Sequence, residues 1–64
     1  MLNNRIKDRR QDKGLTQEEL AAAAGVSRQT IVAIEKGNYI PSLALAMRLA
    51  GLFKMPVEKL FYSK

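Results

Sequence analysis

The apolar residues of segment 17–36 constrain the fold more than any other feature, because they define two short helices that must cross at a glycine. Gly25 lies between the helices, where the chain must reverse and a residue with positive φ is easiest to accommodate. Ala21 is small enough to let the two helices approach closely. The residues expected on the facing sides are Leu20, Ala21 and Ala24 in the first helix and Val26, Ile31 and Ile34 in the second.

Capping residues and glycines divide the whole chain into five predicted helices. Thr16 and Glu19 have the T-x-x-E spacing of a capping box at the start of the second helix, and Ser27 caps the third. No useful stretch alternates with period two, so an interior strand is not expected, although a pairing of residues 1–3 with residues 61–63 is left open. Asn3 or Asn4 is expected to cap the first helix, which runs to about residue 13. The other expected ranges are 17–24, 28 to about 36, 43 to about 53 after Ser42, and 57 to about 61 after Pro56.

The faces of these helices predict an all-α fold with one hydrophobic core. A chain of 64 residues is expected to form a single domain, in which each buried methyl group matters. The residues expected in the core are Ile6, Leu15, Leu20, Ala21, Ala24, Val26, Ile31, Ile34, Leu43, Ala46, Leu49, Ala50, Phe53, Val57 and Leu60.

The composition narrows the classes of function. Cysteine and histidine are both absent, which removes the common thiolate nucleophile, general base and metal ligands, so no metal or cofactor is expected. Eleven basic residues against six acidic ones give a net charge of +5, which suits nucleic acid, an anionic membrane or an acidic partner. Apolar runs are too short for a membrane span or a signal peptide, so a cytoplasmic location and no membrane contact are expected.

The segments NRIKDRRQDKGLTQEELA, GVSRQTIVAIEKG, PSLALAMRLAGLF and PVEKLF resemble the Cro/C1-type helix-turn-helix family of small prokaryotic and phage transcriptional regulators. The resemblance runs from about residue 4 to residue 61. It implies a five-helix lambda-repressor-like DNA-binding domain over residues 1–64, with the helix-turn-helix on the second and third helices and a short C-terminal dimerisation segment. The implied partner is an operator in double-stranded DNA, with the third helix in its major groove.

The resemblance implies roles for the outward residues of the third helix. Arg28 and Gln29 are expected to contact base edges, because arginine pairs with guanine O6 and N7 and glutamine with adenine N6 and N7. Val32 and Ala33, one turn on, would contact a thymine methyl. The expected contacts to the DNA backbone are Gln17, Ser27, Thr30, Lys36, Asn38, Tyr39 and Arg10.

Two structural alternatives stand beside these roles. Ser27 is equally well explained as a helix cap, and Thr30 as a residue that packs beside Ile31.

Arg10 and Glu35 resemble the family's ion pair between the first and third helices, which would fix the recognition helix. An exposed pair would contribute only ~0–1 kcal/mol, whereas loss of one partner from a buried pair would cost several times more.

A homodimer is expected, because one small domain covers few base pairs and binds them weakly at physiological salt. The fourth helix and the C-terminus carry more apolar residues than one core face needs. A two-fold interface built by the last helix and its flanks would place recognition helices about 34 Å apart. Scattered surface hydrophobic residues are the alternative. The residues expected in the interface are Met47, Leu52, Met55, Phe61 and Tyr62.

Repression is the favoured function, because a chain of this size can block a promoter but has little surface to recruit polymerase. The alternative is an antitoxin-type interaction protein, with an unidentified protein partner and autoregulatory DNA binding. An enzyme is disfavoured, since no histidine is present to activate Ser27 or Thr16, and RNA binding is disfavoured for want of an aromatic sheet platform.

Overall fold

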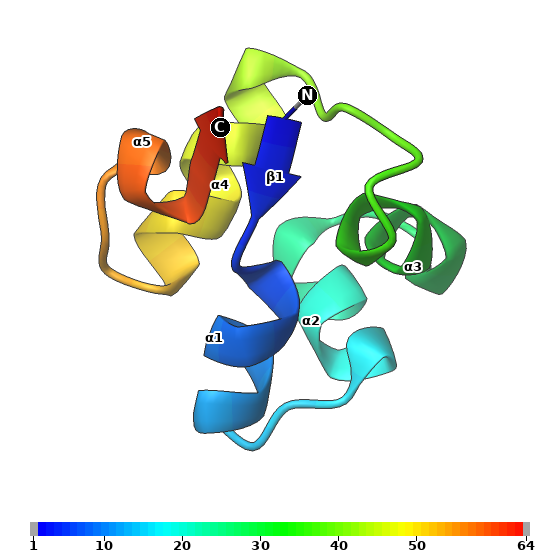
Figure 1. The fold of residues 1–64 in the computed structure, drawn as a ribbon. Helices are drawn as coiled ribbons and strands as arrows, with labels where there is room; N and C mark the ends of the chain where they lie inside the picture. The colour runs from blue at the N-terminus through cyan, green and yellow to red at the C-terminus, as the bar shows by residue number, and fades with distance from the viewer. Residues whose placement is uncertain (1, 64) are drawn as a thin grey trace.

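Five helices and a two-stranded sheet make up residues 2–63, the part of the chain that the computed structural model describes (Figure 1). Helices α2 and α3 contact each other extensively, α4 packs on α2, and α1 lies against α3. None of the helices in residues 2–63 is long and apolar enough to cross a membrane. The order of elements is β1 (Leu2–Asn4), α1 (Ile6–Asp12), α2 (Gln17–Ala24), α3 (Arg28–Glu35), α4 (Leu43–Leu52), α5 (Val57–Leu60) and β2 (Phe61–Ser63).

Local caps begin the three helices that form the centre of the fold. Thr16 Oγ1 accepts a hydrogen bond from the Glu19 backbone N–H at 3.0 Å, and the Glu19 carboxylate accepts one from Thr16 N–H at 2.8 Å, which confirms the predicted capping box. Ser27 caps α3 and Ser42 caps α4 in the same way, each through its hydroxyl oxygen. Gly25 ends α2 with φ 73°, as expected for a left-handed C-terminal residue.

The start of α1 differs from the prediction. Neither Asn3 nor Asn4 is the capping residue, because both belong to β1, and Arg5 occupies the cap position without a side-chain hydrogen bond to the helix. The Asn4 carboxamide instead links two elements: its Oδ1 accepts from Ile6 N–H at 3.1 Å and its Nδ2 donates to the Ile34 carbonyl at 2.8 Å. Asn4 therefore ties the beginning of α1 to the end of α3.

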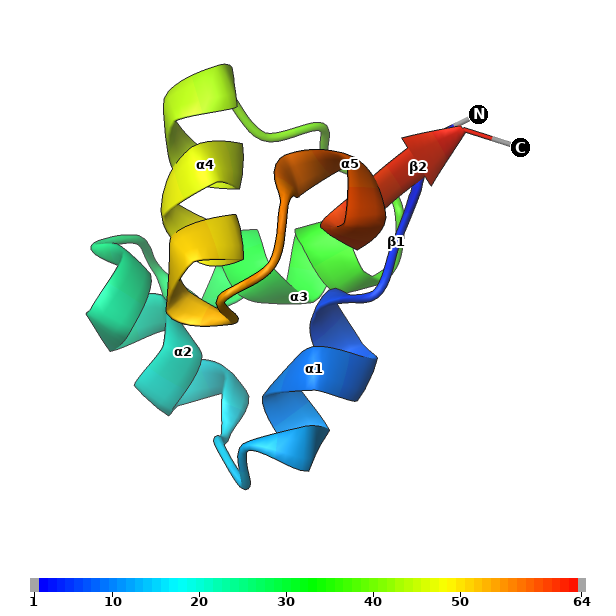
Figure 2. The same ribbon diagram turned by 90° about the vertical axis from the view of Figure 1, so that its left-hand side faces the viewer.

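The two ends of the described chain form a small antiparallel sheet, so the all-α prediction is only approximate. The paired residues are Leu2 with Ser63, Asn3 with Tyr62 and Asn4 with Phe61, and the two strands lie side by side in both views (Figure 2). The pairing of residues 1–3 with 61–63 that the sequence left open is therefore present, with residues 2–4 as the first strand. The part of that alternative that concerns Met1 lies outside the described residues. Period-two alternation cannot reveal strands this short, because they depend on a partner that is distant in the sequence.

The core lies between α1, α2, α3 and α4 and is closed by α5 and β2. Most predicted core residues are buried, and Leu15, Val26 and Val57 pack against the core while remaining partly exposed. Leu43 is a wrong prediction: it is 72% exposed, and Leu45 (7% exposed) is buried in its place. The inward face of α4 is set by Leu45, Ala46, Leu49 and Ala50, and Leu43 and Met47 lie one turn apart on the outer side.

Candidate nucleic-acid interface

Helix α3 has one face in the core and one face open to solvent. Ile31 and Ile34 are completely buried, and they anchor the helix against α2 and α1. On the opposite side Arg28 and Gln29 are exposed, whereas Val32 and Ala33 are half-buried. The four residues predicted to contact bases therefore lie outside the core, with the two polar residues at the N-terminal end of the helix.

The hydroxyl groups at the start of α3 are engaged with each other. Ser27 Oγ accepts from Thr30 N–H at 3.2 Å and lies 3.0 Å from Thr30 Oγ1. This geometry matches the capping alternative for Ser27, and it gives Thr30 a partner within its own helix. The phosphate contacts of these two residues stay a prediction.

Three further predicted backbone contacts follow the C-terminal end of α3. Lys36 is the C-terminal cap of the helix, and Asn38 and Tyr39 follow in the exposed loop. The Asn38 backbone N–H donates to the Ala33 carbonyl at 2.9 Å, which fixes the path of the chain as it leaves the helix. The loop therefore begins with a defined conformation beside the open face of α3.

Arg10 and Glu35 form a buried ion pair that joins α1 to the end of α3. Arg10 Nε donates to Glu35 Oε2 at 2.7 Å, and the two side chains are only 11% and 5% exposed. The Arg10 Nη2 group donates to Glu35 Oε1 at 3.3 Å, and Nη1 donates to the Leu15 carbonyl at 2.8 Å. The exposed-pair alternative is therefore wrong. Each nitrogen of the guanidinium donates within the protein, and Nη1 and Nη2 each keep a second N–H outside these bonds. The phosphate contact of Arg10 stays a prediction.

Gln17 also belongs to this cluster, a link that the sequence did not reveal. Its Nε2 donates to Glu35 Oε1 at 3.1 Å, so Glu35 accepts hydrogen bonds from both α1 and α2. A carboxylate can only accept, which requires the nitrogen rather than the oxygen of the Gln17 amide to face it. The second hydrogen of Nε2 is not used by this bond.

The predicted dimer residues do not form one exposed surface. Met47 is 58% exposed, but Phe61 is 8% exposed and packs in the core, which corrects its predicted place at the surface. Leu52 and Met55 are partly buried against the core, and the Tyr62 ring lies under the Arg5 guanidinium with Cζ 4.5 Å from its centroid. The large hydrophobic residues exposed in the described part of the chain are Tyr39, Ile40, Leu43 and Met47.

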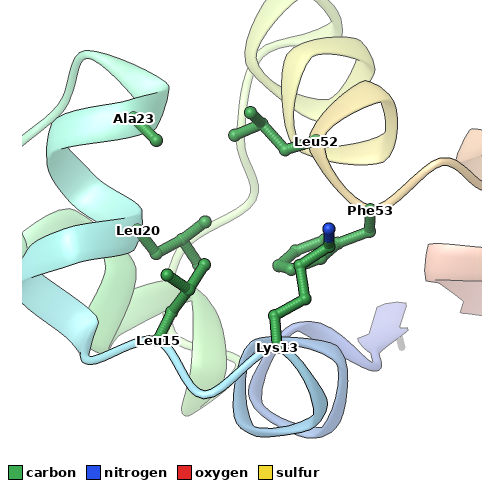
Figure 3. Close-up of a pocket in the computed structure, with 6 residues that line it drawn as sticks. All are labelled: Lys13, Leu15, Leu20, Ala23, Leu52 and Phe53. Carbon is green, nitrogen blue, oxygen red and sulfur yellow. The ribbon is translucent and has the colours of Figure 1, made fainter.

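A separate hollow of about 300 Å³ opens between α2 and the C-terminal ends of α1 and α4 (Figure 3), and none of its lining residues belongs to α3. Lys13 supplies its one charged group, and the rest of the lining is hydrocarbon. The residues that line it are Lys13, Leu15, Leu20, Ala23, Leu52 and Phe53.

The fold and the open face of α3 define a DNA-binding regulator of the helix-turn-helix class. A sequence model described as helix-turn-helix matches residues 6–60. The chain belongs to the Cro/C1-type helix-turn-helix family, whose members are DNA-binding transcriptional regulators rather than enzymes.

Three similar proteins illustrate this membership. The chain is 52% identical over 60 residues to an uncharacterized HTH-type transcriptional regulator of Methanocaldococcus jannaschii, covering 94% of this chain and 91% of that protein. It is 37% identical over 60 residues to the phage CTXphi transcriptional repressor RstR of Vibrio cholerae, covering 94% of this chain and 54% of RstR. Among solved structures, the restriction-modification controller protein C.AhdI of Aeromonas hydrophila is similar, with a TM-score of 0.78, 31% identity, and coverage of 86% of this chain and 83% of that one.

Proposed function

We propose that this protein binds a specific operator in double-stranded DNA as a homodimer and represses transcription by occupying a promoter. The observation that carries the proposal is the exposure of Arg28 and Gln29 on a helix whose opposite face is fixed in the core. A major groove about 12 Å wide admits such a helix, and both side chains can make bidentate contacts to base edges. The net charge of +5 adds attraction to phosphates that does not depend on sequence.

Selection of bound duplexes from a random pool tests the proposal. We expect a two-fold symmetric site with half-sites about 34 Å apart, one helical turn along the same side of the DNA. Arg28→Ala should relax specificity at one position of each half-site, with a loss of about 1–3 kcal/mol per contact. Lys59 is exposed on α5, and Lys59→Ala is the control that removes one positive charge from a residue not expected to contact bases. A pool that shows no enrichment after repeated selection would contradict sequence-specific binding.

The apolar surface of Ile40, Leu43 and Met47 favours association with a protein, and a second copy of this chain is the occupant that a symmetric operator requires. An antitoxin would use the same surface for a different protein. Sedimentation of the purified chain separates the two, since a self-associating repressor sediments as a dimer without any added partner. A monomer at concentrations well above those that saturate DNA would favour the antitoxin.

A further inference from the structure

A cleft on the surface between α1 and α3 lies next to the face that is proposed to contact bases. Its volume is about 380 Å³, and Val32 of α3 lies at its edge, so the cleft is continuous with the proposed base-contacting residues. We call it the α1–α3 cleft. The residues that line it are Lys7, Arg10, Gln17, Val32, Glu35 and Lys36.

The charges in the α1–α3 cleft are unbalanced in favour of cations. Arg10 and Glu35 are paired at 2.7 Å and neutralise each other at its base. Lys7 and Lys36 are exposed, and among the described residues neither side chain makes an ion pair or a hydrogen bond. Asp8 follows Lys7 directly in α1, and successive helical residues point to different sides. The cleft thus presents two free ammonium groups on flexible stems.

The Gln17 amide supplies a third donor of fixed orientation. Because Nε2 must face Glu35, one of its hydrogens is committed to Oε1 at 3.1 Å and the other remains available to an acceptor in the cleft. A phosphate oxygen accepts hydrogen bonds and carries negative charge, so it suits an amide donor flanked by ammonium groups. Glu35 therefore acts as a positioning residue for Gln17 as well as an ion-pair partner.

We propose that one backbone phosphate of the bound duplex lies in the α1–α3 cleft, and that Lys7 contacts it together with Gln17 and Lys36. Helix α1 then takes part in DNA binding directly, as well as supporting α3 through Arg10. This proposal rests on the proposed DNA-binding function, and it adds Lys7 to Gln17, Lys36 and Arg10, which the resemblance already implies as contacts to the DNA backbone. Lys7 fixes position along the backbone without contacting a base.

The salt dependence of binding tests this contact. Each phosphate neutralised by a cation contributes about −0.9 to the slope of log K against log salt concentration on double-stranded DNA. Lys7→Gln should therefore make the slope shallower by about one, both on a mixed-sequence duplex and on the selected operator. At 0.1 M salt, affinity should fall by up to about tenfold.

Lys13→Gln is the matched control, because it removes the same charge at the end of the same helix but lines the separate hollow of Figure 3. The slope of log K against log salt concentration for Lys13→Gln should stay close to that of the unaltered protein. Equal changes for Lys7→Gln and Lys13→Gln would show a mere net-charge effect and would overturn the proposal, as would an unchanged slope for Lys7→Gln. Binding of the unaltered protein to DNA with neither sequence preference nor salt dependence would instead overturn the proposed function itself.

A double-mutant cycle adds a measurement that net charge alone does not affect. Gln17→Ala should weaken binding with no comparable change in slope, because the lost group is neutral. If Lys7 and Gln17 contact one phosphate, the combined loss in Lys7→Gln/Gln17→Ala should differ from the product of the separate losses by at least about twofold. Exact multiplicativity would place the two residues on different phosphates and would overturn the shared site.

Discussion

Arg48 Nη1 donates a 2.7 Å hydrogen bond to the carbonyl oxygen of Ala24, the last residue of α2. The donor belongs to α4, so this bond fastens α4 to the turn between α2 and α3. A cation at the C-terminal end of a helix also interacts favourably with the helix dipole. The same Nη1 would lie 3.7 Å from a Cβ built on Gly25, so the guanidinium covers the turn closely. Arg48 therefore supports the turn that sets the angle of the recognition helix.

Replacement of Arg48 by leucine should lower the free energy of unfolding by about 1–2 kcal/mol, because a hydrogen bond from a charged group to an acceptor at a helix end is lost. Arg48→Lys should lower the free energy of unfolding by less than Arg48→Leu does, since an ammonium group can still reach the Ala24 carbonyl. Urea denaturation followed by circular dichroism measures both changes. Lys59→Leu, an exposed cation on α5, is the control. Equal stability of the Arg48→Leu and Lys59→Leu variants would show that the bond does not contribute.

The Arg10–Glu35 pair should behave as a buried unit. Arg10→Met leaves the Glu35 carboxylate, 5% exposed, without its cation and should cost about 3–5 kcal/mol, a large part of the stability of a 64-residue domain. Arg10→Met/Glu35→Leu should be considerably more stable than Arg10→Met alone, because no buried charge is then unpaired. Guanidinium chloride denaturation of both single variants and the double variant gives the coupling energy. Additive losses would contradict a buried pair.

Signals that act over a few residues made the helix-turn-helix predictable. The capping box of Thr16 and Glu19, the Ser27 cap and the Gly25 turn each depend on neighbours within three or four positions, and all are present in the structure. The pairing of the two ends was only left open from the sequence, because β1 and β2 are three residues each and pair across the length of the chain. Phe61 was placed in a dimer interface because the C-terminal part of the chain carries more apolar residues than one core face needs, whereas it packs in the core.

The candidate site was predictable to a similar degree. The positions of Arg28 and Gln29 outside the core follow from helical period alone, and the Arg10–Glu35 contact followed from the resemblance. The Gln17–Glu35 bond joins residues 18 positions apart and the Arg48–Ala24 bond joins residues 24 apart. No periodicity or motif records such pairs, because they arise only when α4 and the end of α3 are packed on α2.

Truncation of two leucines in α4 tests which face of this helix packs in the core. Leu45→Ala should cost about 2–5 kcal/mol, since Leu45 is 7% exposed and its removal leaves a cavity. Leu43→Ala should change stability by less than about 0.5 kcal/mol, because the side chain is 72% exposed. Thermal or urea unfolding of the two variants compares them directly. Equal losses would mean that Leu43 is also buried, for example in a dimer at the protein concentration used.

Self-association, which belongs to the proposed function, should depend on the outer side of α4. Tyr39, Ile40, Leu43 and Met47 all follow the end of α3 within a short segment, and a hollow of about 440 Å³ beside Leu43 is lined mainly by apolar groups. Ile40, Leu43 and Met47 are 71%, 72% and 58% exposed and Tyr39 is 47% exposed, and we refer to these four residues as the patch. Exposed apolar surface favours contact with another protein.

Leu43→Glu and Met47→Glu should each weaken the dimer by about 10- to 100-fold. The reason is that formation of the dimer would then bury a carboxylate against apolar groups. Neither change touches the core, so the unfolding transition should stay cooperative, and sedimentation velocity should show a folded monomer. Ala22→Glu, an exposed alanine on α2, is the control for adding a carboxylate to a helix outside the patch. DNA affinity should fall most for the symmetric operator and least for an isolated half-site, since only the former requires two copies. An unchanged dimer in both patch variants would place the interface elsewhere, and the partly buried Leu52 and Met55 would be the next residues to replace.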